Sequence, residues 1–255
     1  MDEVLLDVRD SVAVLTLSGP ESRNAVTAKM NRQISAACRT INEDHTIGAA
    51  IVRGADGTFC AGSNRGEWSG SRRDPAEAEA FERSTVVYQM LLDVGGLEVP
   101  TVAAVRGAAV GGGFNLALAC DVRVVSMTAR LVGGFLSNGL HPGGGFFALL
   151  GRSAGREVAA AVGLFGVDVM GVDAVRLGLA LESVDDGEVE DRAWVLASRA
   201  ARDPELSRMC TSSYRAQLGP PPVPWAVAVE ADRGRQMWSH RRRESASADR
   251  GKSSQ

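Results

Sequence analysis

The chain has 255 residues, of which 45% are apolar and 23% are charged, and its formal net charge is −3. This balance is typical of a single globular α/β domain, and it lacks the basic surplus with which proteins bind nucleic acid or anionic membranes. The apolar runs are shorter than the roughly 18 residues of a membrane span, and the acidic start Met1-Asp2-Glu3 is unlike a presequence, so we expect a cytoplasmic protein.

The N-terminal part of the chain predicts strands that alternate with helices. Two apolar runs, 4–8 and 12–17, indicate a hairpin because a short polar turn separates them. Thr27 is a suitable N-cap for a helix that ends near residue 42, and a buried strand at 49–52 follows. This strand–helix–strand order indicates a sheet with helices on its flank.

The middle of the chain predicts a second series of elements around a glycine turn. In chain order they are a helix at 74–93, a strand at 101–105, the turn Gly111-Gly112-Gly113, a helix at 114–120, a strand at 122–125 and a glycine-rich loop at 133–145. Further helical segments are expected at 146–150, 155–164, 171–177 and 188–201.

A proline cluster at 220–224 precedes the last predicted element, an amphipathic helix at 225–238. The tail at 244–255 is rich in Ser, Lys and Arg and is expected to be disordered. The four cysteines form no CxxC pair and the chain has only three histidines, so no structural metal site is expected.

Two glycine turns carry the strongest chemical signal. At Gly111-Gly112-Gly113 a helix begins, and the first N–H groups of a helix have no partner within it and carry partial positive charge. Glycine also lets an oxygen approach the backbone closely, so this turn suits an oxyanion. Ala61-Gly62-Ser63 follows another strand and offers a second N–H. The alternative is a tight connection without a chemical role, and a phosphate loop is not indicated because its GxxxxGK[ST] motif does not occur.

Five short motifs follow one another along the chain. They are Arg23-Asn24-Ala25-Val26, Phe59-Cys60-Ala61-Gly62-Ser63, Val105-Arg106-Gly107-Ala108-Ala109-Val110-Gly111-Gly112-Gly113, Ala119-Cys120-Asp121 and Gly139-Leu140-His141-Pro142-Gly143-Gly144-Gly145. In order and spacing they resemble the motifs of the crotonase, or enoyl-CoA hydratase/isomerase, family over residues 3–200. The resemblance implies an α/β fold with a crotonase-like ββα spiral core at 1–200. It also implies a C-terminal helical region at 201–243 that packs trimers or hexamers.

The same resemblance implies an acyl-CoA thioester as the ligand, with coenzyme A as part of the substrate and no separate cofactor. It places an oxyanion hole on the N–H groups of Ser63 and Gly112. Other residues expected at the substrate are Arg23, Ala25, Val26, Ala61, Asn64, Gly111, Asn115 and Phe135. Arg23 is either a partner of the CoA phosphates or a solvated surface residue.

Two positions depart from the family pattern. Hydratases of this family use one glutamate in the helix after the glycine turn and a second one further along the chain, and those positions hold Asn115 and Phe135 here. Addition of water to an enoyl thioester needs groups that accept and deliver protons, which neither an amide nor a phenyl ring does. Hydration by two glutamates is therefore not expected, and Phe135 is expected to make the pocket drier.

Several residues are candidates to replace the missing carboxylates. Because an imidazole moves protons at neutral pH, His141 in the glycine-rich loop is one, although it also fits a polar loop position. Glu67 follows the first turn and is either a pocket carboxylate or a surface residue. Cys60 is either a nucleophile or a small core residue. Arg233 and its neighbours either bind CoA phosphates or lie on a solvated helix face.

The sequence therefore predicts an enzyme of the lyase or isomerase type that stabilises an enolate-like intermediate of an acyl-CoA. A non-catalytic acyl-CoA carrier is the first alternative, and Asn115 and Phe135 favour it. A structural oligomer with an unused site is the second, and the two intact glycine turns argue against it.

Overall fold

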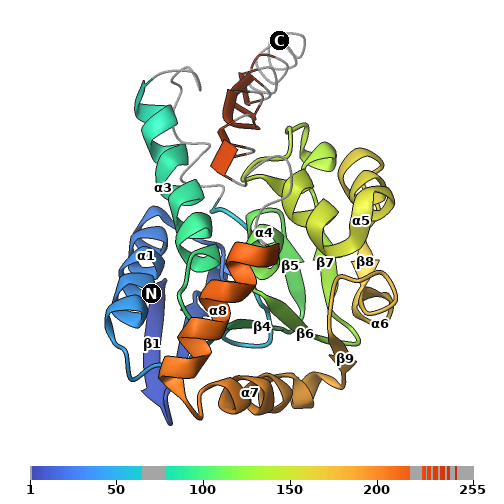
Figure 1. Ribbon diagram of the computed structural model, residues 1–255. Coiled ribbons are helices and arrows are strands. Elements are labelled where there is room, and N and C mark those ends of the chain that lie inside the picture. The colour runs from blue at the N-terminus through green and yellow to red at the C-terminus, as the bar shows by residue number, and fades with distance from the viewer. Residues whose placement is uncertain are drawn as a thin grey trace.

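The computed structural model describes residues 2–64 and 78–218 and, beyond them, 226–227, 229–230, 232–234, 236–238, 240–241 and 245. A six-stranded sheet with the order β1-β2-β3-β4-β6-β9 forms the centre of the molecule (Figure 1). Its strands are β1 Glu3–Arg9, β2 Val12–Ser18, β3 Ala49–Gly54, β4 Thr101–Val105, β6 Val122–Ser126 and β9 Glu182–Val184. β1 pairs with β2 antiparallel, and the remaining pairs are parallel.

A smaller sheet of three strands with the order β5-β7-β8 lies beside the large one. Its strands are β5 Ala108–Val110, β7 Arg130–Val132 and β8 Val169–Met170. β5 follows β4 after only two residues, so the chain passes from one sheet to the other just before the glycine turn. The α-helices within 2–64 and 78–218 are α1 Ala28–Glu43, α3 Ala78–Gly95, α4 Gly112–Ala119, α5 Phe146–Leu164, α6 Gly171–Ala174, α7 Val189–Ala200 and α8 Pro204–Leu218.

The two faces of the large sheet are buried in separate apolar clusters. Side chains alternate along a strand, so Ala13 and Leu15 of β2 face one cluster while Val12 faces the other. The first cluster joins the sheet to α1, α3, α4 and α5, and the second joins it to α7. Figure 1 shows α7 across the bottom of the sheet and α4 in the middle of the molecule. α4 is thus surrounded, which explains why its sequence is apolar on all sides.

Most of the predicted elements are confirmed. The hairpin, the strand at 101–105 and the helix capped by Thr27 form as expected, and the Thr27 hydroxyl accepts a hydrogen bond from the Met30 N–H at 3.1 Å. The segments predicted at 146–150 and 155–164 belong to α5, which is broken at Gly155, where φ is 78°. The short strands β5, β7, β8 and β9 were not predicted, and α8 was expected only as part of the C-terminal helical region at 201–243, without bounds of its own. Ten of the fourteen residues of the predicted helix at 225–238 are described, and all ten are helical, whereas Ser245 is the one described residue of the tail at 244–255.

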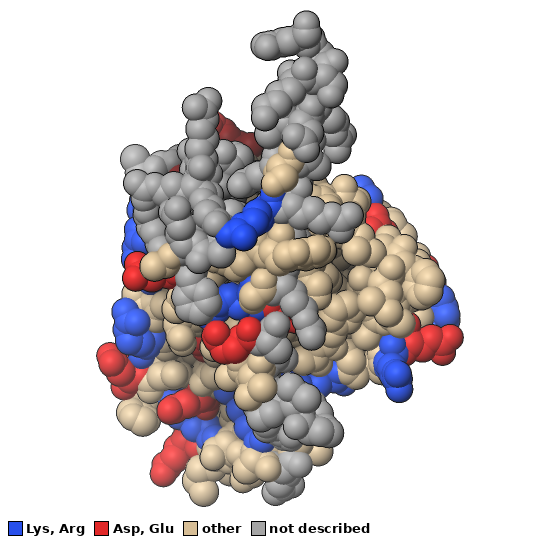
Figure 2. Space-filling view, turned by 90° about the horizontal axis from the view of Figure 1, so that it is seen from above, with Lys and Arg blue, Asp and Glu red and all other residues tan. Residues whose placement is uncertain are grey.

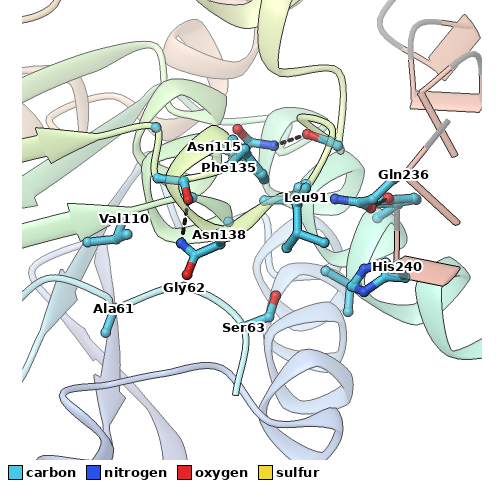
Figure 3. A pocket seen from close by; sticks show the side chains of 18 residues that line it. Ala61, Gly62, Ser63, Leu91, Val110, Asn115, Phe135, Asn138, Gln236 and His240 are labelled. Atoms are coloured by element: carbon cyan, nitrogen blue, oxygen red, sulfur yellow. Dashed lines mark hydrogen bonds between the residues drawn. The ribbon is translucent and has the colours of Figure 1, made fainter. Parts of the chain in front are cut away.

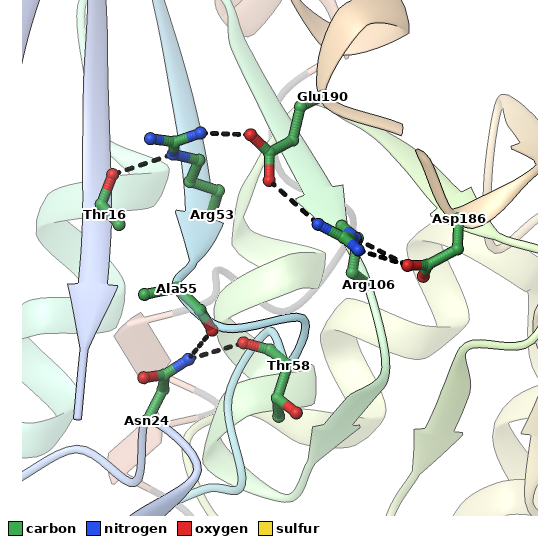
Figure 4. Close-up of polar contacts among 8 residues, drawn as sticks. All are labelled: Thr16, Asn24, Arg53, Ala55, Thr58, Arg106, Asp186 and Glu190. Carbon is green, nitrogen blue, oxygen red and sulfur yellow. Dashed lines mark hydrogen bonds and ion pairs between the residues drawn. The ribbon is translucent and has the colours of Figure 1, made fainter. Parts of the chain in front are cut away.

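Ion pairs fasten α7 to the carboxyl ends of the central strands. Arg53 of β3 donates to Thr16 Oγ1 at 3.0 Å and pairs with Glu190 (Figure 4). Arg106, which follows β4, pairs with Asp186 and reaches Glu190 at 3.6 Å. In the described ranges, no helix is long and apolar enough to cross a membrane.

Candidate functional site

A cavity of about 330 Å³ lies where the two glycine turns meet (Figure 3). Its lining comes from the turn after β3, the start of α4, α3, the loop after β7 and the C-terminal segment. The residues are Ala61, Gly62, Ser63, Val87, Tyr88, Leu91, Val110, Gly111, Gly112, Asn115, Gly133, Gly134, Phe135, Asn138, Leu140, Gly143, Gln236 and His240. Six of the predicted site residues are thereby brought together: Ala61, Ser63, Gly111, Gly112, Asn115 and Phe135.

Backbone hydrogen bonds through Cys60 join the two turns. The Cys60 N–H donates to the Ala108 carbonyl at 3.0 Å, and the Val110 N–H donates to the Cys60 carbonyl at 3.0 Å. The Cys60 thiol is fully buried and accepts the Gly62 N–H at 3.4 Å. The position of one turn is therefore fixed relative to the other by the backbone itself.

The N–H groups of Ser63 and Gly112 lie near each other and are not used elsewhere in the described chain. The Val26 N–H donates to the Gly62 carbonyl at 2.7 Å, and the Val26 carbonyl accepts the Asn64 N–H at 3.0 Å. The Ser63 N–H therefore points away from Val26. Gly112 is the first residue of α4, so its N–H has no acceptor within the helix. A methyl group placed on Gly112 would lie 3.8 Å from the Ser63 nitrogen. Two backbone donors thus border one region of the cavity.

Two of the glycines are required by this close packing. A methyl group on Gly62 would lie 2.8 Å from the Val110 carbonyl oxygen, and the φ of Gly62 is +96°, which other residues rarely adopt. A methyl group on Gly113 would lie 2.8 Å from Cys60 Cβ. Larger residues at either position would separate the two turns.

The side chain of Asn24 stabilises the chain just before the first turn through hydrogen bonds. Its side chain is buried, accepts the Gly19 N–H at 2.8 Å and donates to the carbonyls of Ala55 and Thr58 at 2.9 and 2.6 Å (Figure 4). Asn24 adopts φ of 58°, a left-handed conformation that asparagine tolerates better than most residues. Asn24 belongs to the motif Arg23-Asn24-Ala25-Val26, and its role in this turn was not predicted.

Asn115 and Phe135 lie on the α4 and β7 sides of the cavity. The Asn115 amide is 1% exposed and donates to the Gly143 carbonyl at 2.8 Å. Its Oδ1 has no partner among the described residues. The Phe135 ring packs edge-on against Phe146, with 5.1 Å between the ring centroids. Phe135 therefore gives this wall an aromatic surface.

The C-terminal segment covers the cavity next to α3. Gln236 bonds the Tyr88 hydroxyl, and the Arg233 guanidinium lies 5.0 Å over the Tyr88 ring and donates to Thr85 Oγ1 at 2.6 Å. Arg233 is 4% exposed and pairs with Glu230, so its charge is used inside the fold and not at a solvated surface. Burial raises the pKa of Tyr88 well above its usual range, which keeps the phenol neutral. His240 also lines the cavity and was not among the predicted site residues.

The other predicted residues lie elsewhere. His141 does not line the cavity; its Nδ1 lies 2.6 Å from the Pro142 carbonyl oxygen. Arg23, Ala25, Val26 and Asn64 run alongside the first turn without lining the cavity, so their place at coenzyme A stays a prediction. Glu67 lies outside the described residues.

The charge around the site is mixed. On the face seen in Figure 2, basic and acidic side chains lie next to one another, and the coloured residues form no continuous basic area. The described residues hold no group of three or more His, Cys, Asp or Glu arranged for a metal ion. The arrangement at the cavity is therefore one of backbone dipoles and apolar walls.

Comparisons with known proteins agree with this geometry. The family model described as enoyl-CoA hydratase/isomerase matches residues 7–252. A Mycobacterium tuberculosis protein named probable enoyl-CoA hydratase EchA14 is 40% identical over 219 residues, which cover 86% of this chain and 84% of that protein. The 1,2-epoxyphenylacetyl-CoA isomerase of Escherichia coli is 30% identical and covers 80% of this chain and 78% of its own.

Solved structures show the same fold. A crystal structure of an enoyl-CoA hydratase from Polaromonas sp. JS666 superposes with a TM-score of 0.79 at 25% identity, covering 98% of this chain and 97% of that one. A probable enoyl-CoA hydratase/isomerase from Mycobacterium abscessus gives a TM-score of 0.75 at 29% identity, covering 84% and 82%.

Proposed function

Because this chain belongs to the enoyl-CoA hydratase/isomerase, or crotonase, family, we propose that it binds an acyl-CoA thioester and stabilises an enolate-like intermediate with the backbone N–H groups of Ser63 and Gly112. The observation that carries the proposal is the convergence of these two unused donors on one cavity. Such preorganised donors act on charge that develops during the reaction, and each contributes about 10²–10³-fold to the rate in comparable enzymes.

Hydration by two carboxylates does not fit this cavity. Of the described residues that line it, none is an Asp or Glu, and Tyr88 and His240 are the titratable ones. Because burial raises the pKa of Tyr88, this phenol is a poor base. An imidazole exchanges protons near neutral pH, so we assign proton transfer at the α-carbon to His240 in place of His141. The relative named as an epoxyphenylacetyl-CoA isomerase supports chemistry other than hydration in this family.

A non-catalytic acyl-CoA binding protein is the second candidate. The same absence of a carboxylate among the described lining residues favours it, together with the apolar wall at Phe135. Both candidates use the oxyanion hole to hold the thioester carbonyl, so affinity alone does not separate them. Turnover at the α-carbon separates the enzyme from the binding protein.

Exchange of α-protons is the test, because it reports an enolate whatever reaction follows. Butyryl-CoA is incubated with the protein in D2O and deuterium uptake is measured by mass spectrometry, while calorimetry gives the affinity. We expect uptake with butyryl-CoA and none with S-butyl-CoA, a thioether without a carbonyl. Binding without uptake over several acyl groups would favour the carrier, and no binding would contradict both candidates.

Two substitutions assign the roles. Gly112→Pro removes the N–H but suits the first position of a helix, whereas Gly112→Ala keeps the N–H and adds a methyl group 3.4 Å from Ser63 Oγ. We expect Gly112→Pro to slow uptake about 10²-fold more than Gly112→Ala. His240→Gln should slow uptake by about 10²-fold or more and remove its pH dependence near neutrality. If His141→Ala slowed deuterium uptake more than His240→Gln, proton transfer at the α-carbon would be assigned to His141.

A further inference from the structure

A second cavity of about 400 Å³ lies directly behind the first. Gly133, Gly134 and Phe135 line both cavities, so this short stretch after β7 is the partition between them. Two of these three residues are glycines. The only side chain that the partition contains is therefore the ring of Phe135.

The Phe135 ring is held at one end of the partition. A methyl group on Gly111 would lie 3.8 Å from Phe135 Cζ, which places the tip of the ring next to the glycine turn. The ring also packs against Phe146 at an interplanar angle of 64°. The backbone of the partition is fixed separately, because Ser137 Oγ donates to the Gly134 carbonyl at 3.1 Å. Truncation of the ring would therefore open the partition without removing its support.

One part of the second cavity can receive the far end of an alkyl chain, although Arg130, Ser137 and Asp168 line another part. Val132, Leu136 and Val162 give it apolar walls. Its polar part includes Arg130 and Asp168, which pair with each other at 2.9 Å and are both solvent-accessible. Because these two charges already compensate each other, the cavity has no free charge for a second acyl-CoA headgroup. It is a continuation of the first cavity and not an independent phosphate site.

From this partition we propose that Phe135 sets the length of the acyl group, and that the second cavity receives the distal methylenes of longer chains when the ring is displaced. The inference rests on the proposed function, since the chain must enter from a thioester held at Ser63 and Gly112. Short acyl groups end at the ring. Longer acyl groups contact the apolar walls behind the Phe135 ring only if the ring moves.

The test is a calorimetric series of saturated acyl-CoAs from butyryl to hexadecanoyl. For the natural protein, we expect the affinity to rise by about fourfold per buried methylene and then to stop rising at the length that reaches Phe135. Phe135→Ala should extend the rise to longer chains, so that the ratio of the Kd of butyryl-CoA to the Kd of those chains grows at least tenfold. Phe135→Leu, which disturbs packing less, should give a smaller shift in the same direction.

Two controls make the result specific. Phe147→Ala removes the same ring from a residue that lines neither cavity, and it should leave the length profile unchanged. Val162→Phe adds bulk at a residue that lines the second cavity only and leaves the Ser137 hydrogen bond in place, so it should cancel the gain when combined with Phe135→Ala. An identical length profile in all variants that bind butyryl-CoA would overturn the proposal. Failure of the natural protein to bind butyryl-CoA would instead contradict the proposed function.

Discussion

At the scale of single residues, Cys60 lies next to the proposed oxyanion hole without lining the cavity. Burial raises the pKa of its thiol to about 12, so the group stays protonated and is not a nucleophile. Its sulfur accepts the Gly62 N–H, and Gly62 precedes the donor Ser63. The thiol therefore positions the Ala61–Gly62 peptide, which immediately precedes the peptide that carries the Ser63 N–H.

Substitution of Cys60 tests this role. Cys60→Ala removes the acceptor and should slow α-proton exchange about tenfold, the loss expected for one hydrogen bond, while the Kd of butyryl-CoA stays nearly constant. Cys60→Ser keeps an acceptor and should recover most of the rate. Cys38→Ala, at a buried cysteine of α1 that does not line the cavity, is the control for loss of packing. Equal rates for Cys60→Ala and Cys60→Ser would show that only volume matters at this position.

At the scale of elements, the sequence predicts what is local and misses what depends on distant pairing. Apolar runs, the Thr27 cap and the glycine turns each lie within one short stretch, so they were found. β5 and β7 have three residues each, too few to show a period of two. They are strands because their backbones pair across 22 residues of sequence, as between Ala108 and Arg130.

The same limit applies to the site. Ser63, Gly112 and the aromatic wall at Phe135 followed from motifs whose spacing is visible in the sequence. His240 did not, because nothing near it in the sequence indicates that it lies against α3 and the cavity. Asn24 carries a weak local signal, since asparagine tolerates a left-handed backbone, but the carbonyls that it bonds follow it by more than thirty residues.

The helix α8, which lies in the predicted helical region at 201–243, closes the end of α1. Arg208 of α8 donates to the carbonyls of Ile41, Asp44 and Ile47 at 2.6, 2.9 and 3.2 Å. The last carbonyls of a helix have no partner within it and carry partial negative charge, so a guanidinium stabilises them. The Arg208 side chain is only 10% exposed, which makes the contact more valuable than a surface ion pair.

Removal of the Arg208 head group should therefore destabilise the fold. Arg208→Met keeps the aliphatic stem but leaves several carbonyls without a donor, and we expect the free energy of unfolding to fall by about 2 kcal/mol. Urea unfolding followed by circular dichroism measures this change. Arg39→Met, on the exposed side of α1, should stay within about 0.5 kcal/mol of the natural protein. A similar small change for Arg208→Met would mean that water replaces the guanidinium.

At the scale of the whole molecule, several large apolar side chains near α5 and α6 are exposed to solvent. They include Leu164 at the end of α5 and Phe165 and Val167 just after it, with Phe165 at 79%. Val172 of α6 and Leu181 before β9 are also more than half exposed. Contiguous exposed apolar residues of this kind mark interaction surfaces. This surface is compatible with the predicted trimer or hexamer, and so is α8 in the C-terminal region expected to pack the trimer, where Leu206, Met209 and Leu218 are more than half exposed.

Phe165→Glu tests which region holds subunits together. A charge at the centre of a buried apolar interface is costly to desolvate, so we expect light scattering at micromolar concentration to fall from the mass of an oligomer to that of a monomer. Leu5→Glu adds the same charge at an exposed position of β1, on the opposite side of the molecule in Figure 1, and should leave the mass unchanged. Dissociation by Met209→Glu of α8 but not by Phe165→Glu would place the interface in the C-terminal helices. A natural protein that is already monomeric would contradict both assignments, because the apolar side chains would then face water in solution.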